Sequence, residues 1–133
     1  MVKSEGSNVQ TVGRIDIEKY RCITDEIATD EVIITPERIQ HIEERHPGDY
    51  EQFVKYIADI LANPDYILEA NKPNTGVILK EIEENGEKFK VILRVKVESD
   101  PAEYQNSILS FWRIGETTWN KNVKNKKILY KRE

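Results

Sequence analysis

The spacing of apolar residues changes once along the chain, near residue 65, and this change constrains the fold more than any other feature. Before residue 65, apolar side chains recur at helical spacing; after it they alternate, as in strands with two different faces. A run of helices followed by a run of strands predicts an α+β domain. The chain has 133 residues, enough for one domain with its own core.

Two helices are predicted before the change. The first spans 36–46, with Thr35 as its cap and Pro36 in its first turn, and Pro47-Gly48 ends it. The second spans 49–62, with Asp49 as its cap. Its apolar positions form one helical stripe: Tyr50, Phe53, Val54, Ile57, Ile60 and Leu61.

The start of the chain gives weaker signals. Residues 1–13 are polar and aperiodic, which predicts a flexible leader in front of a single domain over 14–133. The apolar run at 32–34 predicts a short strand or an extended lead-in to the first helix.

Four strands are predicted after residue 65, and Asn85-Gly86 marks a tight hairpin between the second and third. We therefore expect two N-terminal helices packed on one face of a four-stranded antiparallel sheet. A short helix at 116–125 and a short edge strand at 127–132 follow. The four strands span residues 66–70, 75–82, 89–97 and 105–114.

Composition excludes several classes of protein. Cys22 is the only cysteine, so a disulfide framework and a cysteine metal site are excluded, and a reducing, cytoplasmic compartment is expected. No apolar run approaches the roughly 18 residues that a membrane helix needs. The net charge of −4 is uneven, since residues 1–70 sum to −8 and residues 119–133 to +5. The basic end is either a solvated tail or a contact for a polyanion.

The chain has two histidines, His41 and His46, both in the first predicted helix. At roughly 100° per residue, His46 falls on the stripe of Ile39 and Ile42, and His41 on the opposite, solvent side. An inward imidazole is either a core or helix-end side chain, or a general acid or base. Two histidines five residues apart do not make a zinc pair, so no metal is expected.

Cations and aromatic residues occupy the predicted strands. Lys90, Arg94 and Lys96 share one face of the third strand, which is either the hydrated face of the sheet or a row that holds phosphates. On the fourth strand Ser110 and Trp112 share a face. A tryptophan there either packs in a core or stacks on a base, and the serine hydroxyl either fills a polar slot or donates to a phosphate.

The chain resembles a known family in the stretches HIEERHPGDYE, NPDYIL and NSILSFW. Taken together, and with weaker similarity from about residue 14 to the end, they resemble the C-terminal domain of phage head-morphogenesis (minor capsid) proteins. That domain is grouped with the phage barnase–EndoU–colicin–RelE-like nucleases, whose fold is one or two N-terminal helices followed by a four-stranded antiparallel sheet.

The resemblance implies a metal-independent endoribonuclease that needs no cofactor and acts in the host cytoplasm or the phage particle. RNA, with tRNA among the candidates, is the implied substrate, and the reaction is attack by a 2′-hydroxyl to give a cyclic phosphate. A phage structural protein or an immunity protein is the implied partner. The rival interpretation is a catalytically inactive, capsid-associated interaction module.

The family pattern also assigns roles to residues of this chain. It places the helix histidine at His46, the basic strand positions at Lys80 and Arg94, and a late-strand hydroxyl at Ser110, where the family more often has threonine. A two-histidine mechanism is not expected, because His46 is the only inward histidine. Substrate contacts are expected from Lys90, Lys96, Trp112, Lys121 and Lys124.

Overall fold

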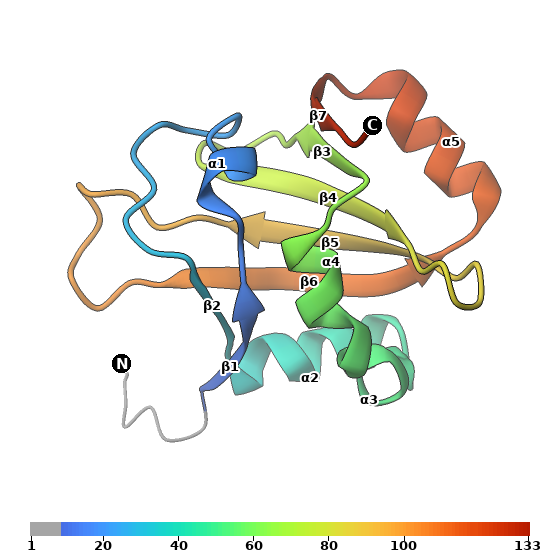
Figure 1. The fold of residues 1–133 in the computed structure, drawn as a ribbon. Coiled ribbons are helices and arrows are strands. Elements are labelled where there is room, and N and C mark those ends of the chain that lie inside the picture. Colours follow the sequence, from blue (N-terminus) through green and yellow to red (C-terminus); the bar gives the residue numbers. More distant parts are fainter. Residues whose placement is uncertain (1–8) are drawn as a thin grey trace.

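The computed structural model describes residues 9–133 and shows an α+β architecture, which confirms the predicted class (Figure 1). In chain order the elements are β1 (Gln10–Arg14), α1 (Ile17–Tyr20), β2 (Glu31–Ile34), α2 (Pro36–Arg45), α3 (Asp49–Phe53), the 3-10 turn η1 (Val54–Tyr56), α4 (Ile57–Ala62), β3 (Tyr66–Glu69), β4 (Thr75–Glu81), β5 (Lys88–Arg94), β6 (Asn106–Ile114), α5 (Glu116–Asn125) and β7 (Ile128–Lys131).

The sheet has seven strands, so the prediction of four is wrong. Its order is β1-β2-β6-β5-β4-β3-β7, and the predicted antiparallel meander forms its centre. At one edge β7 pairs with β3; at the other, β2 runs parallel to β6 and β1 pairs with β2. Residues 10–13 belong to β1, so the leader predicted over 1–13 is wrong there, while residues 1–8 lie outside the described part.

Buried Asn106 joins the added edge to the meander. Its amide donates to the backbone carbonyls of Thr29 and Glu31, at 2.7 and 3.0 Å, and its oxygen accepts from the N–H of Lys96 at 2.6 Å. Three backbone groups at a strand end are thereby satisfied without water. This long-range contact fixes where β2 meets β6.

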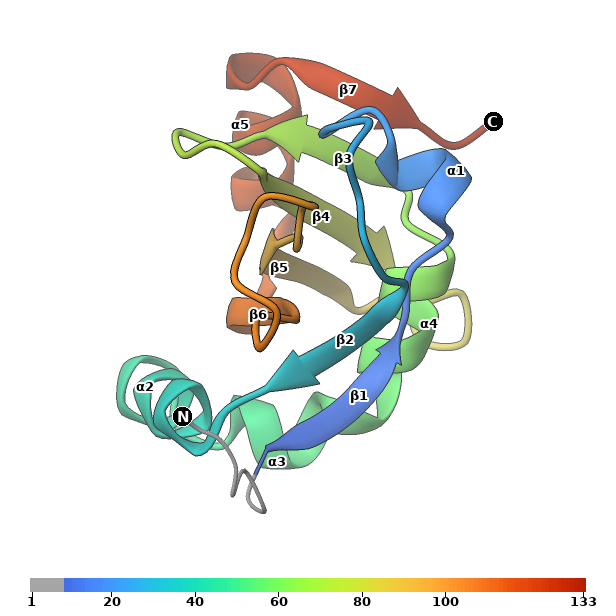
Figure 2. The same ribbon diagram turned by 90° about the vertical axis from the view of Figure 1, so that its left-hand side faces the viewer.

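Helices cover both faces of the sheet: residues of α2 and α4 join the larger core, and α5, for which no face was predicted, packs on the other face. In Figure 2, α4 and α5 lie on opposite sides of the strands. The larger core holds Ile57 and Ile60 of α4 together with Ile78 of β4; the smaller holds Leu79 of β4 with Trp119 of α5. The reason is β4, whose first six residues are all buried, as in a strand covered on both sides.

The first helix begins and ends as expected, but the second does not. Thr35 Oγ1 accepts from the N–H of Arg38 at 3.2 Å, which caps α2. The stretch predicted as one helix over 49–62 is broken into α3, η1 and α4. Asp49 does not cap it: Gly48, with a φ of 85°, occupies the cap, and the Asp49 carboxylate accepts from the Arg113 N–H at 3.1 Å.

Over residues 9–133, no helix is both long and apolar enough to span a membrane.

Candidate functional site

A cavity of about 310 Å³ opens between α2, the strands β4 to β6 and the segment after α5. We call it the cationic cavity. None of the described residues that line it is Asp or Glu. Its polar lining includes Arg38, His41, Lys72, Lys90, Ser110 and Lys126. Because the positive charges have no carboxylate among them, the cavity attracts anions even though the whole chain is acidic.

Helix α2 supplies Arg38 and His41, which lie three residues apart and therefore on one side of the helix. The helix contacts β6, which pairs with β2 only at Asn106 and Ser107 (Figure 2). Because of this contact, the side of α2 opposite Ile39 and Ile42 is partly covered by the sheet. His41, on that side, is half-buried and borders the cavity. The prediction that His41 faces solvent is thus wrong.

His46 is the residue that ends α2, and its backbone leaves the helical conformation with φ −137°. The imidazole lies flat against Trp112 of β6, with ring centroids 4.8 Å apart and planes 3° apart. Lys90 of β5 pairs across the sheet with Trp112, and its Nζ lies 5.4 Å from the Trp112 ring centroid. His46 itself does not line the cationic cavity; Lys90 does, and Lys90 also lies over the Trp112 ring on which His46 stacks.

Two of these groups have perturbed acidities. Burial lowers the pKa of His46, and His41 and Arg45 act in the same direction while Asp49 opposes them. Burial also lowers the pKa of Lys90, and the charge of Lys126 adds to the effect. Neutral His46 is therefore favoured at neutral pH, which suits a proton acceptor.

Lys80 lies on the opposite face of the sheet. It pairs with Phe89, a residue of the larger core, whereas its neighbour Leu79 pairs with Lys90. Its side chain is only 4% exposed, and Nζ lies 3.6 Å from Asp65 Oδ1. The structure therefore separates Lys80 from His46, with which the family pattern groups it.

Arg94 and Lys96 bind the loop between β5 and β6. Arg94 donates two hydrogen bonds to the carboxylate of Asp100, at 2.6 and 3.1 Å, and another to the Val95 carbonyl. The hydrogen bond to Asp100 raises the pKa of Arg94. Lys96 Nζ donates to the carbonyl of Ala102 at 2.9 Å. Neither cation lines the cationic cavity.

Of the remaining predicted site residues, some lie at the cationic cavity and others lie away from it. Ser110 lines the cavity and Trp112 adjoins it through Lys90, as described above. Lys121 and Lys124 are exposed on α5 and do not line it, whereas Lys126, just beyond the helix, does. Sequence reasoning missed Arg38, His41 and Lys72; the three-residue spacing in α2 was the one available signal for the first two. Over the described residues, no cluster of three His, Cys, Asp or Glu could hold a metal ion.

A comparison with protein families identifies the chain's similarity to a nuclease-like family. The model described as phage-Barnase-EndoU-ColicinE5/D-RelE like nuclease2 matches residues 7–131, nearly the whole chain. No curated protein and no solved structure gives a significant match.

Proposed function

The chain belongs to the phage-Barnase-EndoU-ColicinE5/D-RelE like nuclease 2 family, and from this premise we propose that it is a metal-independent endoribonuclease whose site is the cationic cavity. One observation carries the proposal. Arg38, His41, Lys90, Ser110 and Lys126 come from four separate parts of the chain and converge on one cavity that no described carboxylate lines. Such a site suits a phosphodiester, whose charge it balances.

The histidines are the proton carriers in this proposal. Neutral His46 accepts the proton of the ribose 2′-hydroxyl, and the 2′-oxygen attacks the adjacent phosphorus. The bond between phosphorus and the 5′-oxygen breaks, and His41 as imidazolium donates a proton to that oxygen. The products are a 2′,3′-cyclic phosphate and a free 5′-hydroxyl. A two-histidine mechanism, unexpected from the sequence, is supported by His41 at the cavity.

The cations and the hydroxyl stabilise the phosphate. Lys90, Lys126 and Arg38 are placed to balance the charge that develops on the non-bridging oxygens, and Ser110 can donate to one of them. Lys72, on the exposed turn between β3 and β4, is placed to contact a neighbouring phosphate.

The experiment that tests this proposal identifies the RNA ends that cleavage produces and asks whether cleavage requires the 2′-hydroxyl. Bulk tRNA and mRNA are incubated in EDTA, beside an oligonucleotide pair of the same sequence with ribose or 2′-deoxyribose throughout. We expect RNA ends that carry a cyclic phosphate, and no cutting of the deoxy strand. Equal cutting of both strands would overturn the 2′-hydroxyl mechanism. No cutting of any RNA by the folded protein would instead favour the capsid-associated interaction module.

A further inference from the structure

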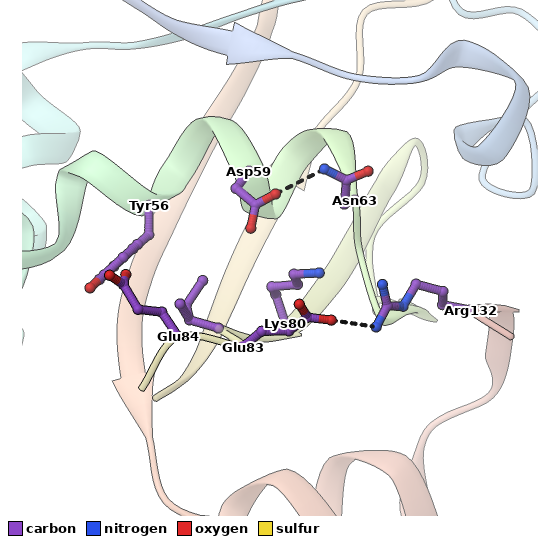
Figure 3. A pocket seen from close by; sticks show the side chains of 8 residues that line it. Tyr56, Asp59, Asn63, Lys80, Glu83, Glu84 and Arg132 are labelled. Carbon is purple, nitrogen blue, oxygen red and sulfur yellow. Dashed lines mark hydrogen bonds and ion pairs between the residues drawn. The ribbon is translucent and has the colours of Figure 1, made fainter. Parts of the chain in front are cut away.

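A second, larger cavity lies on the opposite face of the sheet, between α4, the β4–β5 hairpin and the end of β7 (Figure 3). We call it the Lys80 cavity. Its volume of about 610 Å³ falls within the roughly 300–1,000 Å³ of small-molecule sites. Its polar lining includes Asp59, Asn63, Lys80, Glu83, Glu84 and Arg132.

The floor of this cavity contains an ammonium that the protein does not fully satisfy. Lys80 is only 4% exposed, and although an ammonium has three donors, its Nζ makes no hydrogen bond within the described chain beyond the ion pair with Asp65 Oδ1 at 3.6 Å. Asp65 itself does not line the cavity, and its buried Oδ1 also lies 3.1 Å from Arg132 Nε. Lys80 thus borders the cavity with donors that no described residue accepts.

The charges around the floor restrict the ligand. Two cations, Lys80 and Arg132, face three carboxylates in the lining: Asp59, Glu83 and Glu84. The excess of carboxylates disfavours a phosphate or another anion. The buried ammonium disfavours a cation at the floor, and no described cluster of acidic residues could hold a metal.

A hydroxyl group fits the floor because it donates and accepts at once. It can accept from Lys80 Nζ, and its own proton remains available for a carboxylate of the lining, without any change of charge. Further hydroxyls of the same molecule can donate to Asp59 and Glu84 at the exposed rim, and Figure 3 shows α4 and the hairpin bringing these side chains to the two sides of the opening.

We propose that the Lys80 cavity is a second ligand site that binds a neutral polyhydroxylated molecule, a saccharide of one or two units. The site is independent of the nuclease site, because the pairing of Lys80 with Phe89 and of Leu79 with Lys90 places the two cavities on opposite faces of the sheet. The ligand's hydroxyls complete the hydrogen bonds that the Lys80 ammonium lacks.

The experiment is a titration of the full chain, followed through backbone amide chemical shifts. The probes are glucose, N-acetylglucosamine and ribose, with inorganic phosphate and spermidine as competing classes. We expect saturable shifts at Asp65, Lys80 and Glu81 with at least one sugar. No saturable shift with any of the sugars overturns the proposal, and so do shifts at these amides that saturate only with phosphate or only with spermidine.

Substitutions of residues that line the Lys80 cavity test whether the sugar binds there. We expect Lys80→Met, which keeps the apolar stem, to weaken sugar binding about tenfold or more. Asp59→Ala and Glu84→Gln change exposed rim carboxylates and keep the test valid if Lys80→Met does not fold. Glu37→Gln, an exposed carboxylate on α2, is the matched control and leaves binding unchanged. Equal affinity in the wild type and all three cavity variants would overturn the assignment. We expect Lys90→Ala, which changes the cationic cavity, to leave sugar binding unchanged. The sugar titration therefore tests this proposal independently of the nuclease proposal.

Discussion

The imidazole of His46 and the indole of Trp112 are parallel to within 3°, with their centroids 4.8 Å apart. The contact joins the end of α2 to the middle strands of the sheet, because Trp112 lies opposite Lys90 on β5. It fixes the imidazole in one orientation and excludes water from one of its faces. The stack therefore sets both the position and the acidity of the group that we propose as the proton acceptor.

Replacing the indole tests this relationship. In Trp112→Leu, water reaches the imidazole and the pKa of His46 rises toward its ordinary value, because burial is the main cause of the lowering. We expect the acidic limb of the kcat/KM profile to move to higher pH and kcat to fall about 10- to 100-fold. Trp119→Leu on α5 is the matched control. An NMR titration of His46 that is identical in wild type and Trp112→Leu would contradict this role of the stack.

Lys90 and Lys96 alternate onto the same face of one predicted strand, but only Lys90 lies where it can contact RNA in the cationic cavity. Lys90 lines the cationic cavity, whereas Lys96 is bound to the Ala102 carbonyl. We expect Lys90→Ala to weaken RNA binding and to reduce the slope of log K against log salt by about 1. Lys121→Ala, an exposed lysine of α5, should change the slope less. The measurement is RNA affinity at several salt concentrations, and equal slopes in all proteins would remove Lys90 from the site.

The pair of Arg94 and Asp100 should act on stability. Its hydrogen bonds lower the pKa of Asp100, first through Arg94 and then through the Val97 N–H. Because the folded pKa lies below the unfolded one, the contribution is complete above the unfolded pKa of about 3.9 and is lost as pH falls through the folded pKa. We expect Asp100→Asn to cost about 1 kcal/mol at pH 7.

Urea unfolding of wild type and Asp100→Asn, at neutral pH and at a pH below the Asp100 pKa, measures this contribution. The difference between the two proteins should shrink at the lower pH. A difference that is the same at both pH values would mean that the carboxylate charge contributes nothing.

Asn106 should contribute strongly to the stability of the β2–β6 edge. Asn106→Ala leaves two carbonyls and one N–H without their partner, and we expect a loss of about 2–4 kcal/mol in the free energy of unfolding. Asn120→Ala, an exposed position on α5, is the control and should change stability little. Chemical denaturation measures both, and a small effect at Asn106 would show that the edge is held by other contacts.

Local sequence patterns predicted the centre of the fold but not its edges. The alternation in β5 and the capping residues of α2 are short-range signals, and both elements form where predicted. Strand β2 pairs in parallel with β6, far along the chain, and its site is fixed by Asn106, which no local period reveals. Strand β1 is polar and pairs only with β2.

The candidate site was predicted only in part, and the reason for the errors is related. Alternation tells which residues of one strand share a face, but not which face of the neighbouring strand they join. That depends on register, which here pairs Lys80 with Phe89 across the hairpin at Asn85-Gly86 and so places Lys80 away from Lys90. His41 was missed because a helical wheel gives the angle to Ile39 but not the position of α2 against β6.

The central claim is that His41, which lines the cationic cavity, and His46, which Trp112 and Lys90 connect to that cavity, both act in RNA cleavage. The most direct measurement is the single-turnover rate of RNA cleavage in EDTA. The proteins compared are wild type, His41→Ala, His46→Ala and the double variant, each verified as folded. We expect each single variant to lose about 10²- to 10⁴-fold, and the double variant to lose less than the product of the two losses, since residues that act as a unit are not additive. Wild-type rates in both single variants would contradict the claim.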